Sequence, residues 1–338
     1  MKTRLRWLMA MILTGCVVAL CCAAPRVAGT PQDASVSLSG AQHQFETGNY
    51  AGAISALQPL ASQNSTNPDV YYWLGRNYYE LRDYDNSIAN FEKAVAISPK
   101  SSLYHDWLGR ADGGKADVDR SFSFARKVKK EFEAAVNFDG SNLEARRDLE
   151  EFTLDAPWIV GGNKDEALAQ ANAIAAIDPV AGHLAQALYD REAAKNNQQA
   201  ESEYQQVLAA KPKRLDPYFE VADFYVSQGH PAGIDTAVQA AAAVSPSDLR
   251  IAFYRGVEGV LANQNLPDAE QNLKSYLAST PDRSDWPSLA SARVWLGRLY
   301  ELQGKTPDAA EQYRAALLLN PRFKEARERL DRLGKSSQ

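Results

Sequence analysis

The side chains that most often carry catalysis or bind metals are sparse in this sequence. The four histidines are His43, His105, His183 and His230. They are isolated from one another and lack the His-x-x-x-His spacing that binds zinc from one helix face. A Gly-x-Ser-x-Gly motif, which would present a nucleophilic serine, is also absent from the sequence. We therefore expect a protein that is not an enzyme and that holds neither a metal nor a cofactor.

One stretch comes close to a phosphate-binding motif. Residues 109–116 read GRADGGKA, which nearly matches the P-loop pattern Gly-x-x-x-x-Gly-Lys-Ser/Thr. Ala116 stands where the motif needs a hydroxyl to reach magnesium, and no strand is expected before the stretch. Gly109 also falls on the packing face of a helix. We therefore reject nucleotide binding at this place.

The charged residues favour a surface function without nucleic acid. The chain of 338 residues carries a formal net charge of −5, whereas nucleic-acid binding usually requires clustered lysine and arginine. The only basic cluster is residues 126–130, Arg-Lys-Val-Lys-Lys. A solvated helix face is the expected explanation of this cluster, and a surface for an anionic partner is the alternative.

Residues 1–28 are expected to be a signal peptide, because a positively charged start precedes an apolar run over residues 7–24. Cleavage would release the mature chain, and we favour this outcome. Acylation of Cys16 is the second outcome, since residues 13–16 resemble a bacterial lipobox, and an uncleaved membrane anchor is the third. In each case we expect the protein to be exported. Cleavage would make it periplasmic or secreted, and acylation would make it a membrane-anchored lipoprotein. All three cysteines lie in this segment, so the mature chain cannot form disulfides.

The predicted helices are clearest between Pro68 and Ser101. Four residues follow the spacing i, i+3, i+4, i+7 of one helix face: Tyr71, Leu74, Gly75 and Tyr78. A turn over residues 82–85 and a second amphipathic helix follow, and Pro99 ends that helix because proline clashes with the preceding turn. Such a pair has more apolar surface than two helices can cover. The next pair along the chain must therefore bury the rest.

Variants of this stretch recur through the chain. Their closing residues are one near Ser65, then Pro99, Gly140, Pro179, Pro212, Pro246, Pro281 and Pro321. The tetrapeptide Trp-Leu-Gly-Arg occurs at residues 73–76, 107–110 and 295–298. With a period close to 34 residues, the chain resembles the tetratricopeptide repeat, a helix-turn-helix unit. The resemblance implies an all-α fold, a right-handed α-solenoid superhelix of about eight helix pairs with a C-terminal capping helix.

The solenoid is expected to be continuous over residues 40–338, after a flexible linker over residues 29–39. It departs from the regular repeat near residues 112–126, 156–162 and 282–289. The first departure is expected to lengthen a helix pair and widen its turn. The second, APWIVGG, is apolar, and we expect it to fold back onto the array because an exposed Trp-Ile-Val run invites aggregation. Contact with a partner is the alternative.

In tetratricopeptide arrays the first helix of each pair lines the concave side, which usually takes an extended or helical peptide, and the resemblance implies the same here. The candidate partner-binding residues on that face are Asp69, Tyr72, Arg76, Tyr79, Asp106, Arg110, Asp216, Phe219, Asp223, Ser291 and Arg298. Tyrosine and arginine commonly anchor protein interfaces. Arg76 and Arg110 lie one repeat apart and suit a carboxylate-bearing ligand. An intramolecular pair with Glu80 or Asp106 is the alternative that we favour.

The sequence thus predicts a non-enzymatic exported adaptor that binds a protein or peptide segment in the cell envelope. Its partner is unknown, and no nucleic acid is expected. Contact with a membrane is expected only through the N-terminal segment. One alternative is a carbohydrate- or peptidoglycan-associated module, whose tyrosine and tryptophan side chains would stack on sugars. Another is a structural spacer within an envelope complex.

Overall fold

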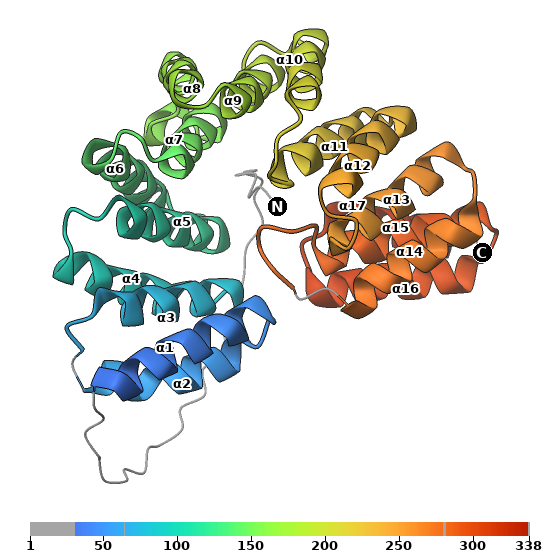
Figure 1. Ribbon diagram of the computed structural model, residues 1–338. Helices are drawn as coiled ribbons and strands as arrows, with labels where there is room; N and C mark the ends of the chain where they lie inside the picture. The colour runs from blue at the N-terminus through green and yellow to red at the C-terminus, as the bar shows by residue number, and fades with distance from the viewer. Residues whose placement is uncertain (1–30, 64, 280–281, 337–338) are drawn as a thin grey trace. The chain divides into compact units, whose positions relative to one another are not determined.

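The computed structural model describes residues 31–63, 65–279 and 282–336. The predicted signal peptide and Cys16 lie outside the described residues. The described part is entirely helical, with seventeen α-helices, one short 3-10 helix and no strand (Figure 1). The prediction of an all-α fold built from about eight helix pairs and a closing helix is confirmed.

The helices fall into two compact units, and the division lies within α8 (Lys164–Ile177), after Gln170. Before α8, the first unit contains α1 (Pro31–Glu46), α2 (Tyr50–Ser62), α3 (Pro68–Glu80), α4 (Tyr84–Ile97), α5 (Ser102–Asp119), α6 (Phe122–Phe138), α7 (Leu143–Asp155) and the 3-10 helix η1 (Trp158–Val160). After α8, the second unit contains α9 (Pro179–Glu192), α10 (Asn197–Ala210), α11 (Asp216–Gln228), α12 (Pro231–Val244), α13 (Leu249–Ala262), α14 (Leu266–Ser279), α15 (Leu289–Leu302), α16 (Thr306–Leu319) and α17 (Lys324–Ser336).

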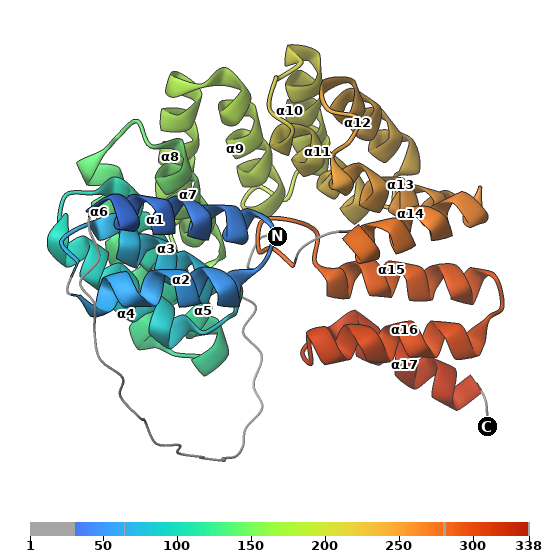
Figure 2. The same cartoon turned by 60° about the horizontal axis from the view of Figure 1, so that its bottom comes forward.

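Consecutive helices pack as pairs, and the first helices of neighbouring pairs also touch. In the first unit α3 contacts α4 and α5 contacts α6, while α1, α3, α5 and α7 contact one another in succession. In the second unit α9, α11, α13 and α15 do the same, and α17 packs on α16 (Figure 2). We call each succession of first helices the first-helix layer of its unit. This is the stacking that the excess apolar surface of a single pair requires.

The turn inside each pair is made by a residue with positive φ. Glycine takes this place at Gly48, Gly161, Gly229 and Gly304, where its missing side chain removes the steric cost. Other residues with positive φ take the same place in the remaining pairs: Arg82, Arg120, Lys195, Asn263 and Asn265. The turns therefore share a backbone conformation and not a residue type. The sequence reveals that conformation only in the pairs where glycine occupies the turn.

The glycine of each Trp-Leu-Gly-Arg tetrapeptide makes room for an aromatic ring of the second helix. A Cβ added at Gly75 would lie 2.7 Å from the Phe91 ring, and one added at Gly297 would lie 2.5 Å from the Tyr313 ring. Both rings are fully buried. The expectation that Gly75 allows a neighbouring helix to come close is thus confirmed, and the close approach fixes how each pair packs.

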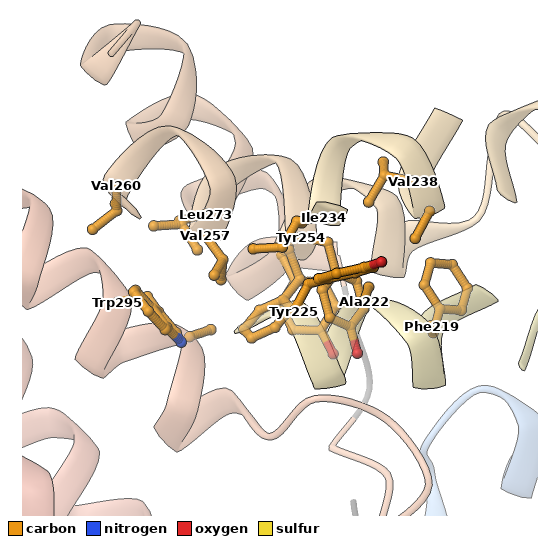
Figure 3. Packing of buried hydrophobic residues seen from close by; sticks show 14 of the residues in the cluster. Phe219, Ala222, Tyr225, Ile234, Val238, Tyr254, Val257, Val260, Leu273 and Trp295 are labelled. Atoms are coloured by element: carbon orange, nitrogen blue, oxygen red, sulfur yellow. The ribbon is translucent and has the colours of Figure 1, made fainter. Parts of the chain in front are cut away.

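The core of the second unit continues from pair to pair. Figure 3 shows Tyr225, Ile234, Tyr254, Leu273 and Trp295, from five successive helices that begin with α11, in one buried cluster. Leu330 and Leu333 of α17, and Phe323 just before it, pack against the same cluster, and Ala326 of α17 is fully buried in it. α17 therefore covers the last apolar face, as a capping helix must.

Two expectations about irregular segments differ from the structure. Helix α1 begins at Pro31, so the flexible linker expected over residues 29–39 is helical from there on. Leu38 packs into the core around Ala41 and Leu57, and this packing outweighs the weak helix preference of the serine-rich stretch. In the segment near residues 112–126, α5 and α6 are lengthened to 18 and 17 residues as expected, but Arg120 and Ser121 alone join them, so the turn is not widened.

Candidate protein-binding surface

In the first unit, Arg76 lies against aromatic rings of the first-helix layer. Its guanidinium carbon is 3.7 Å from the centroid of the Trp107 ring on α5 and 4.7 Å from the Phe45 ring on α1. Its Nη1 donates a hydrogen bond of 2.8 Å to the hydroxyl of Tyr72, which is itself buried. Since α1, α3 and α5 all contribute to this contact, Arg76 joins three successive repeats.

Polar contacts join the same helices. The hydroxyl of Tyr104 donates a hydrogen bond of 2.7 Å to Asp69, across 35 positions in the chain. Burial and this contact with Asp69 raise the pKa of Tyr104 well above its ordinary value. Asp69 and Tyr72, two of the sequence-predicted binding residues, therefore hold α3 against α5.

Arg110 is the centre of an ion-pair network between α5 and α7. Its guanidinium lies 3.2 Å from Asp106 and 3.3 Å from Glu144, and it also contacts Asp148. Asp106 is almost fully buried, and burial raises the pKa of its carboxyl despite the neighbouring guanidinium. The intramolecular pair expected between Arg110 and Asp106 is present. Arg110 thus already has carboxylate partners within the chain.

Beside this network lies a pocket of about 100 Å³. We call it the α5–α7 pocket. Its lining residues come from four helices and the segment after α7: Tyr79 on α3; Gly109, Arg110, Gly113 and Asp117 on α5; Val128 and Phe132 on α6; Asp148, Glu151, Phe152 and Asp155 on α7; and Ala156. Two of the sequence-predicted residues, Tyr79 and Arg110, therefore meet at one hollow of the first-helix layer. Burial, followed by the effect of Tyr84, raises the pKa of Tyr79, so its hydroxyl stays protonated.

Both irregular segments of the first unit reach this pocket. Asp117 lies in the additional length of α5, and Val128 lies in the lengthened α6. Ala156 is the first residue of the apolar segment 156–162. The pocket is thus built where the repeat departs from its regular pattern.

The rest of that apolar segment folds back only in part. Val160 is 3% exposed, whereas Trp158 is 84% and Ile159 is 50% exposed. Lys129 Nζ on α6 donates a hydrogen bond of 3.2 Å to the carbonyl of Gly161 and fixes the base of the loop. The expectation that the whole segment covers the array is therefore wrong for Trp158, because the single turn η1 points successive side chains in different directions and buries only Val160.

In the second unit, the sequence-predicted residues of α11 contact α13. Asp216 pairs with Arg250 at 2.7 Å, and Asp223 accepts a hydrogen bond of 2.8 Å from the Tyr254 hydroxyl. Phe219 stacks on the Tyr254 ring with centroids 5.3 Å apart. Arg250, which sequence reasoning missed, lies over Phe219 at 4.3 Å. Burial opposes its positive charge, but the hydrogen bonds with Asp248 and Asp216 raise the pKa of Arg250.

The two predicted residues on α15 have separate surroundings. The Arg298 guanidinium carbon lies 3.8 Å from the centroid of Trp295, the first residue of its own tetrapeptide, and 3.7 Å separates its Nη1 from Glu325 on α17. Burial and the nearby Arg329 lower the pKa of Arg298. Ser291 is half-buried in the first turn of α15, where its backbone N–H donates to the Ser288 side chain. Of the two, only Arg298 contacts the closing helix α17.

The partners that sequence reasoning missed share one signal. Contacts in the first-helix layers join residues about one repeat apart, namely Asp69 with Tyr104, Arg110 with Glu144, and Asp216 with Arg250. A search for complementary side chains at a separation near 34 residues would have found them. Two histidines also have carboxylate partners. His105 lies 2.6 Å from Glu131, and this hydrogen bond raises the pKa of His105; His183 lies 2.6 Å from Glu203.

Other classes of site find no support in the described part of the chain. Within it, no group of three or more histidine, cysteine, aspartate or glutamate side chains is arranged to hold a metal ion. Residues 109–116, which resemble a P-loop in sequence, lie inside α5. Among the helices of residues 31–336 that the structure describes, none has the length and hydrophobicity needed to cross a bilayer.

Comparison with known proteins gives matches of two kinds. A tetratricopeptide-repeat family model matches residues 38–102 and 259–322. No curated protein shows significant sequence similarity to the chain. Among solved structures, a tetratricopeptide repeat protein from Parabacteroides merdae is 12% identical with a TM-score of 0.49, over 79% of this chain and 98% of that one.

Two further solved structures are similar over most of this chain. The APC/C hetero-tetramer Cut9–Hcn1 is 13% identical with a TM-score of 0.49; the match covers 89% of this chain but only 56% of that one. The C-terminal part of a repeat protein from Cytophaga hutchinsonii is 15% identical with a TM-score of 0.34, over 86% and 98% of the two chains. Residues 38–102 and 259–322 thus match the tetratricopeptide-repeat family in sequence, and both segments consist of stacked helix pairs with positive-φ turns.

Proposed function

We propose that the protein is a non-enzymatic exported adaptor that binds a protein or peptide segment on the first-helix layer of its first unit. Tetratricopeptide repeats are typical protein-interaction scaffolds, and the signal-peptide pattern of residues 1–28 favours the cell envelope. The observation that carries the proposal is the α5–α7 pocket. Most of its lining comes from the first helices α3, α5 and α7, the layer that binds peptides in such arrays, and it has Tyr79 and Arg110 in its wall.

The contacts support a distinction between residues that would shape the surface and residues that would bind the partner. Arg76, Tyr72 and Asp69 are engaged in contacts between repeats, so they would shape the layer without binding directly. The exposed Asp155 and the half-buried Glu151 lie at the pocket and are reachable from outside. A bound segment would therefore run past the C-terminal ends of α5 and α7.

Site-specific photo-crosslinking in intact cells tests the proposal. A photoreactive residue at position 155 of the full chain should give one dominant protein adduct, identified by mass spectrometry. The same residue at position 130 on α6 is the matched control, because the Lys130 side chain is 81% exposed but does not line the pocket. Equal, background-level adducts at both positions would refute an adaptor role for this surface.

A carbohydrate- or peptidoglycan-associated module is the second candidate, and the exposed Trp158 favours it. A tryptophan that is 84% exposed offers a flat apolar face, which is the kind of surface on which sugar rings stack. Sedimentation of the purified protein with cell wall distinguishes the two functions. Retention that is lost in Trp158→Ala would favour the carbohydrate module over the adaptor.

The cellular location is a separate part of the proposal. Fractionation of cells that express the full chain, with a Cys16→Ser variant as control, separates the three N-terminal outcomes. Release into the soluble envelope fraction in both variants indicates cleavage. Membrane association that only the variant loses indicates acylation of Cys16, and membrane association of both proteins indicates an uncleaved anchor. Cytoplasmic recovery of the protein would contradict export.

A further inference from the structure

The connection between α14 and α15 is longer than the other connections between helix pairs of the second unit. It spans residues 280–288, whereas residues 245–248 join α12 to α13. This is the departure from the repeat that the sequence predicts near residues 282–289. Its described part, residues 282–288, contacts the first helix α13 through Trp286. The additional length therefore returns to the first-helix layer of the second unit.

Trp286 lies against the guanidinium of Arg250 on α13. The guanidinium carbon is 5.1 Å from the centroid of the Trp286 ring and 4.3 Å from that of Phe219 on α11. Its nitrogens pair with Asp248 at 2.9 Å and with Asp216 at 2.7 Å. Because a guanidinium is planar, carboxylates at its edge leave its faces to aromatic rings. We call Asp216, Phe219, Asp248 and Arg250 the Arg250 surface.

The segment that carries Trp286 holds its shape through contacts of its own. Arg283 donates two hydrogen bonds to Asp285, of 2.9 and 2.8 Å. The backbone N–H of Trp286 donates to the carbonyl of Arg283 at 3.4 Å, and the Arg283 guanidinium lies 5.2 Å from the Trp286 ring. The turn over residues 283–286 therefore presents the tryptophan as one compact unit.

The chain directly after Trp286 is fixed independently of that ring. The hydroxyl of Tyr276 donates a hydrogen bond to the carbonyl of Pro287. Ser288 is buried, and its side chain caps the first turn of α15. The Trp286 ring itself is only half-buried. The ring can therefore leave Arg250 without the loss of any helical turn.

The Arg250 surface is closed although it belongs to the first-helix layer. Arg250 is 8% exposed and Phe219 is 4% exposed, and Trp286 is part of what covers Arg250. Helices α11 and α13 supply the surface, whereas the ring that lies on it comes from a connection outside the layer. Trp286 is thus placed as an internal ligand of the Arg250 surface.

We propose that the Arg250 surface binds an aromatic side chain of a partner segment, and that Trp286 occupies the surface until the partner displaces it. Asp216 and Phe219 are two of the binding residues predicted from the sequence. Two carboxylates already pair with Arg250, so the surface selects an aromatic ring and not an anion. Tryptophan fits best, because its ring gives the strongest cation–π contact.

Peptide titration of the purified full chain and of its Trp286→Ala variant tests the proposal. The probes are Gly-Gly-Trp-Gly-Gly and Gly-Gly-Leu-Gly-Gly, followed through the backbone NMR signals of Phe219 and Arg250. We expect the tryptophan peptide to bind the variant about tenfold more tightly than the unchanged chain, because Trp286 no longer competes. The leucine peptide should bind the variant about fivefold more weakly than the tryptophan peptide.

Three results of this titration overturn the proposal. Equal affinity of the tryptophan peptide for the unchanged chain and for Trp286→Ala shows that Trp286 does not occupy the site. Equal affinity of the two peptides for the variant shows that the surface does not select an aromatic ring. A variant without shifts at either signal shows that the Arg250 surface binds neither peptide.

Two further variants test the specificity of the effect. Trp158→Ala is the matched control, because it removes an exposed tryptophan of the first unit, and it should bind the tryptophan peptide as weakly as the unchanged chain. Arg250→Lys, added to Trp286→Ala, keeps the positive charge but removes the planar guanidinium, and should weaken the tryptophan peptide about fivefold. Thermal unfolding shows whether each variant folds. Unchanged affinity in the folded Arg250→Lys variant, or a gain of affinity in Trp158→Ala equal to that in Trp286→Ala, overturns the proposal.

This proposal and the proposed function fail separately. Crosslinking from position 155 tests the α5–α7 pocket of the first unit, whereas the peptide titration tests the Arg250 surface of the second unit. The comparison of Trp286→Ala with the unchanged chain also does not depend on whether the Arg250→Lys variant folds.

Discussion

At the scale of single residues, most of the sequence-predicted binding side chains join one repeat to the next. Three of them on α3 contact α5: Asp69 bonds with Tyr104, and Tyr72 and Arg76 lie against Trp107. In the second unit, Asp216 on α11 pairs with Arg250 on α13. Each of these side chains, on one first helix, lies beside the first helix that follows. Polar side chains at these positions therefore help to stabilise the stack before they meet any partner.

Arg76→Ala should destabilise the first unit. The variant loses the contacts with the Phe45 and Trp107 rings and the hydrogen bond to Tyr72, together about 1–2 kcal/mol. The midpoint of urea unfolding, followed by tryptophan fluorescence, measures the effect. Arg126→Ala, at an exposed position on α6, is the control and should change the midpoint little. Equal midpoints for the two variants would contradict a stabilising role for Arg76.

Asp112 should make stability fall as pH rises. Burial raises its pKa from 3.8 to about 7, and nearby Glu131 adds to this while Lys127 opposes it. Between these two pH values the folded protein holds a proton that the unfolded chain has lost, so the contribution of Asp112 to stability is greatest at low pH and decreases until pH 7. Asp112→Asn removes this dependence and should gain roughly 2 kcal/mol relative to the unchanged protein between pH 5 and pH 8. Urea unfolding at both pH values tests this, with the exposed Asp331→Asn as control.

The sequence predicted which side chains lie on the first-helix layer better than it predicted which side chains they contact. The repeat phase placed Tyr79 and Arg110 on the first-helix layer, and the structure brings both to one pocket. It did not reveal Asp148, because the partner of a charged side chain depends on how far neighbouring helices are shifted along each other. That shift is set by the buried glycine and ring contacts, which a helix-period pattern does not describe.

At the scale of helices, the close pairing of glycine with an aromatic ring sets the packing distance. Gly75→Ala should cost about 1–3 kcal/mol, because the added methyl group would lie 2.7 Å from the buried Phe91 ring. Gly40→Ala is the matched control on α1, where nothing lies within 4 Å, and it should be stabilising by roughly 0.5–1 kcal/mol. Thermal unfolding of both variants provides the comparison. A stabilised Gly75→Ala variant would show that the pair can move apart.

Two residues of the segment after α7 should differ in their effect on stability, because one is buried and the other is exposed. Val160→Ala should destabilise the protein by about 1 kcal/mol, because Val160 packs into the core formed by α6 and α7. Trp158→Ala should change stability by less than about 0.5 kcal/mol, since its ring is 84% exposed. Chemical denaturation measures both. A large loss in Trp158→Ala would mean that the ring is covered in solution.

The sequence located this segment but not the orientation of its side chains. A single 3-10 turn that buries only its third residue leaves no periodic signal in the sequence. In the same way, residues 112–126 were recognised as a departure, whereas the structure shows that they lengthen two helices without widening the turn. Long periodic helices are predictable because many residues repeat one rule; a short irregular segment depends on contacts that only the fold provides.

At the scale of the whole molecule, the repeated helix pair made the fold predictable from the sequence. The α5–α7 pocket forms where the repeat is interrupted. The pairs share a turn residue with positive φ, and three of them share a glycine that lies against an aromatic ring, so much of their fold follows from one repeat unit. The α5–α7 pocket arises where two successive pairs of the first unit break the pattern, with additional residues in α5 and α6 and an additional segment after α7. We infer that binding specificity resides in these departures from the repeat.

The central claim is that a partner segment occupies the α5–α7 pocket. The most direct measurement is photo-crosslinking from position 155 in intact cells that express either Gly113→Leu or the control Gly40→Leu in place of the unchanged chain. We predict that the protein adduct persists in the Gly40→Leu variant and is lost in the Gly113→Leu variant at equal protein levels. An adduct of the same identity and yield in both variants would show that the partner binds elsewhere and would contradict the account.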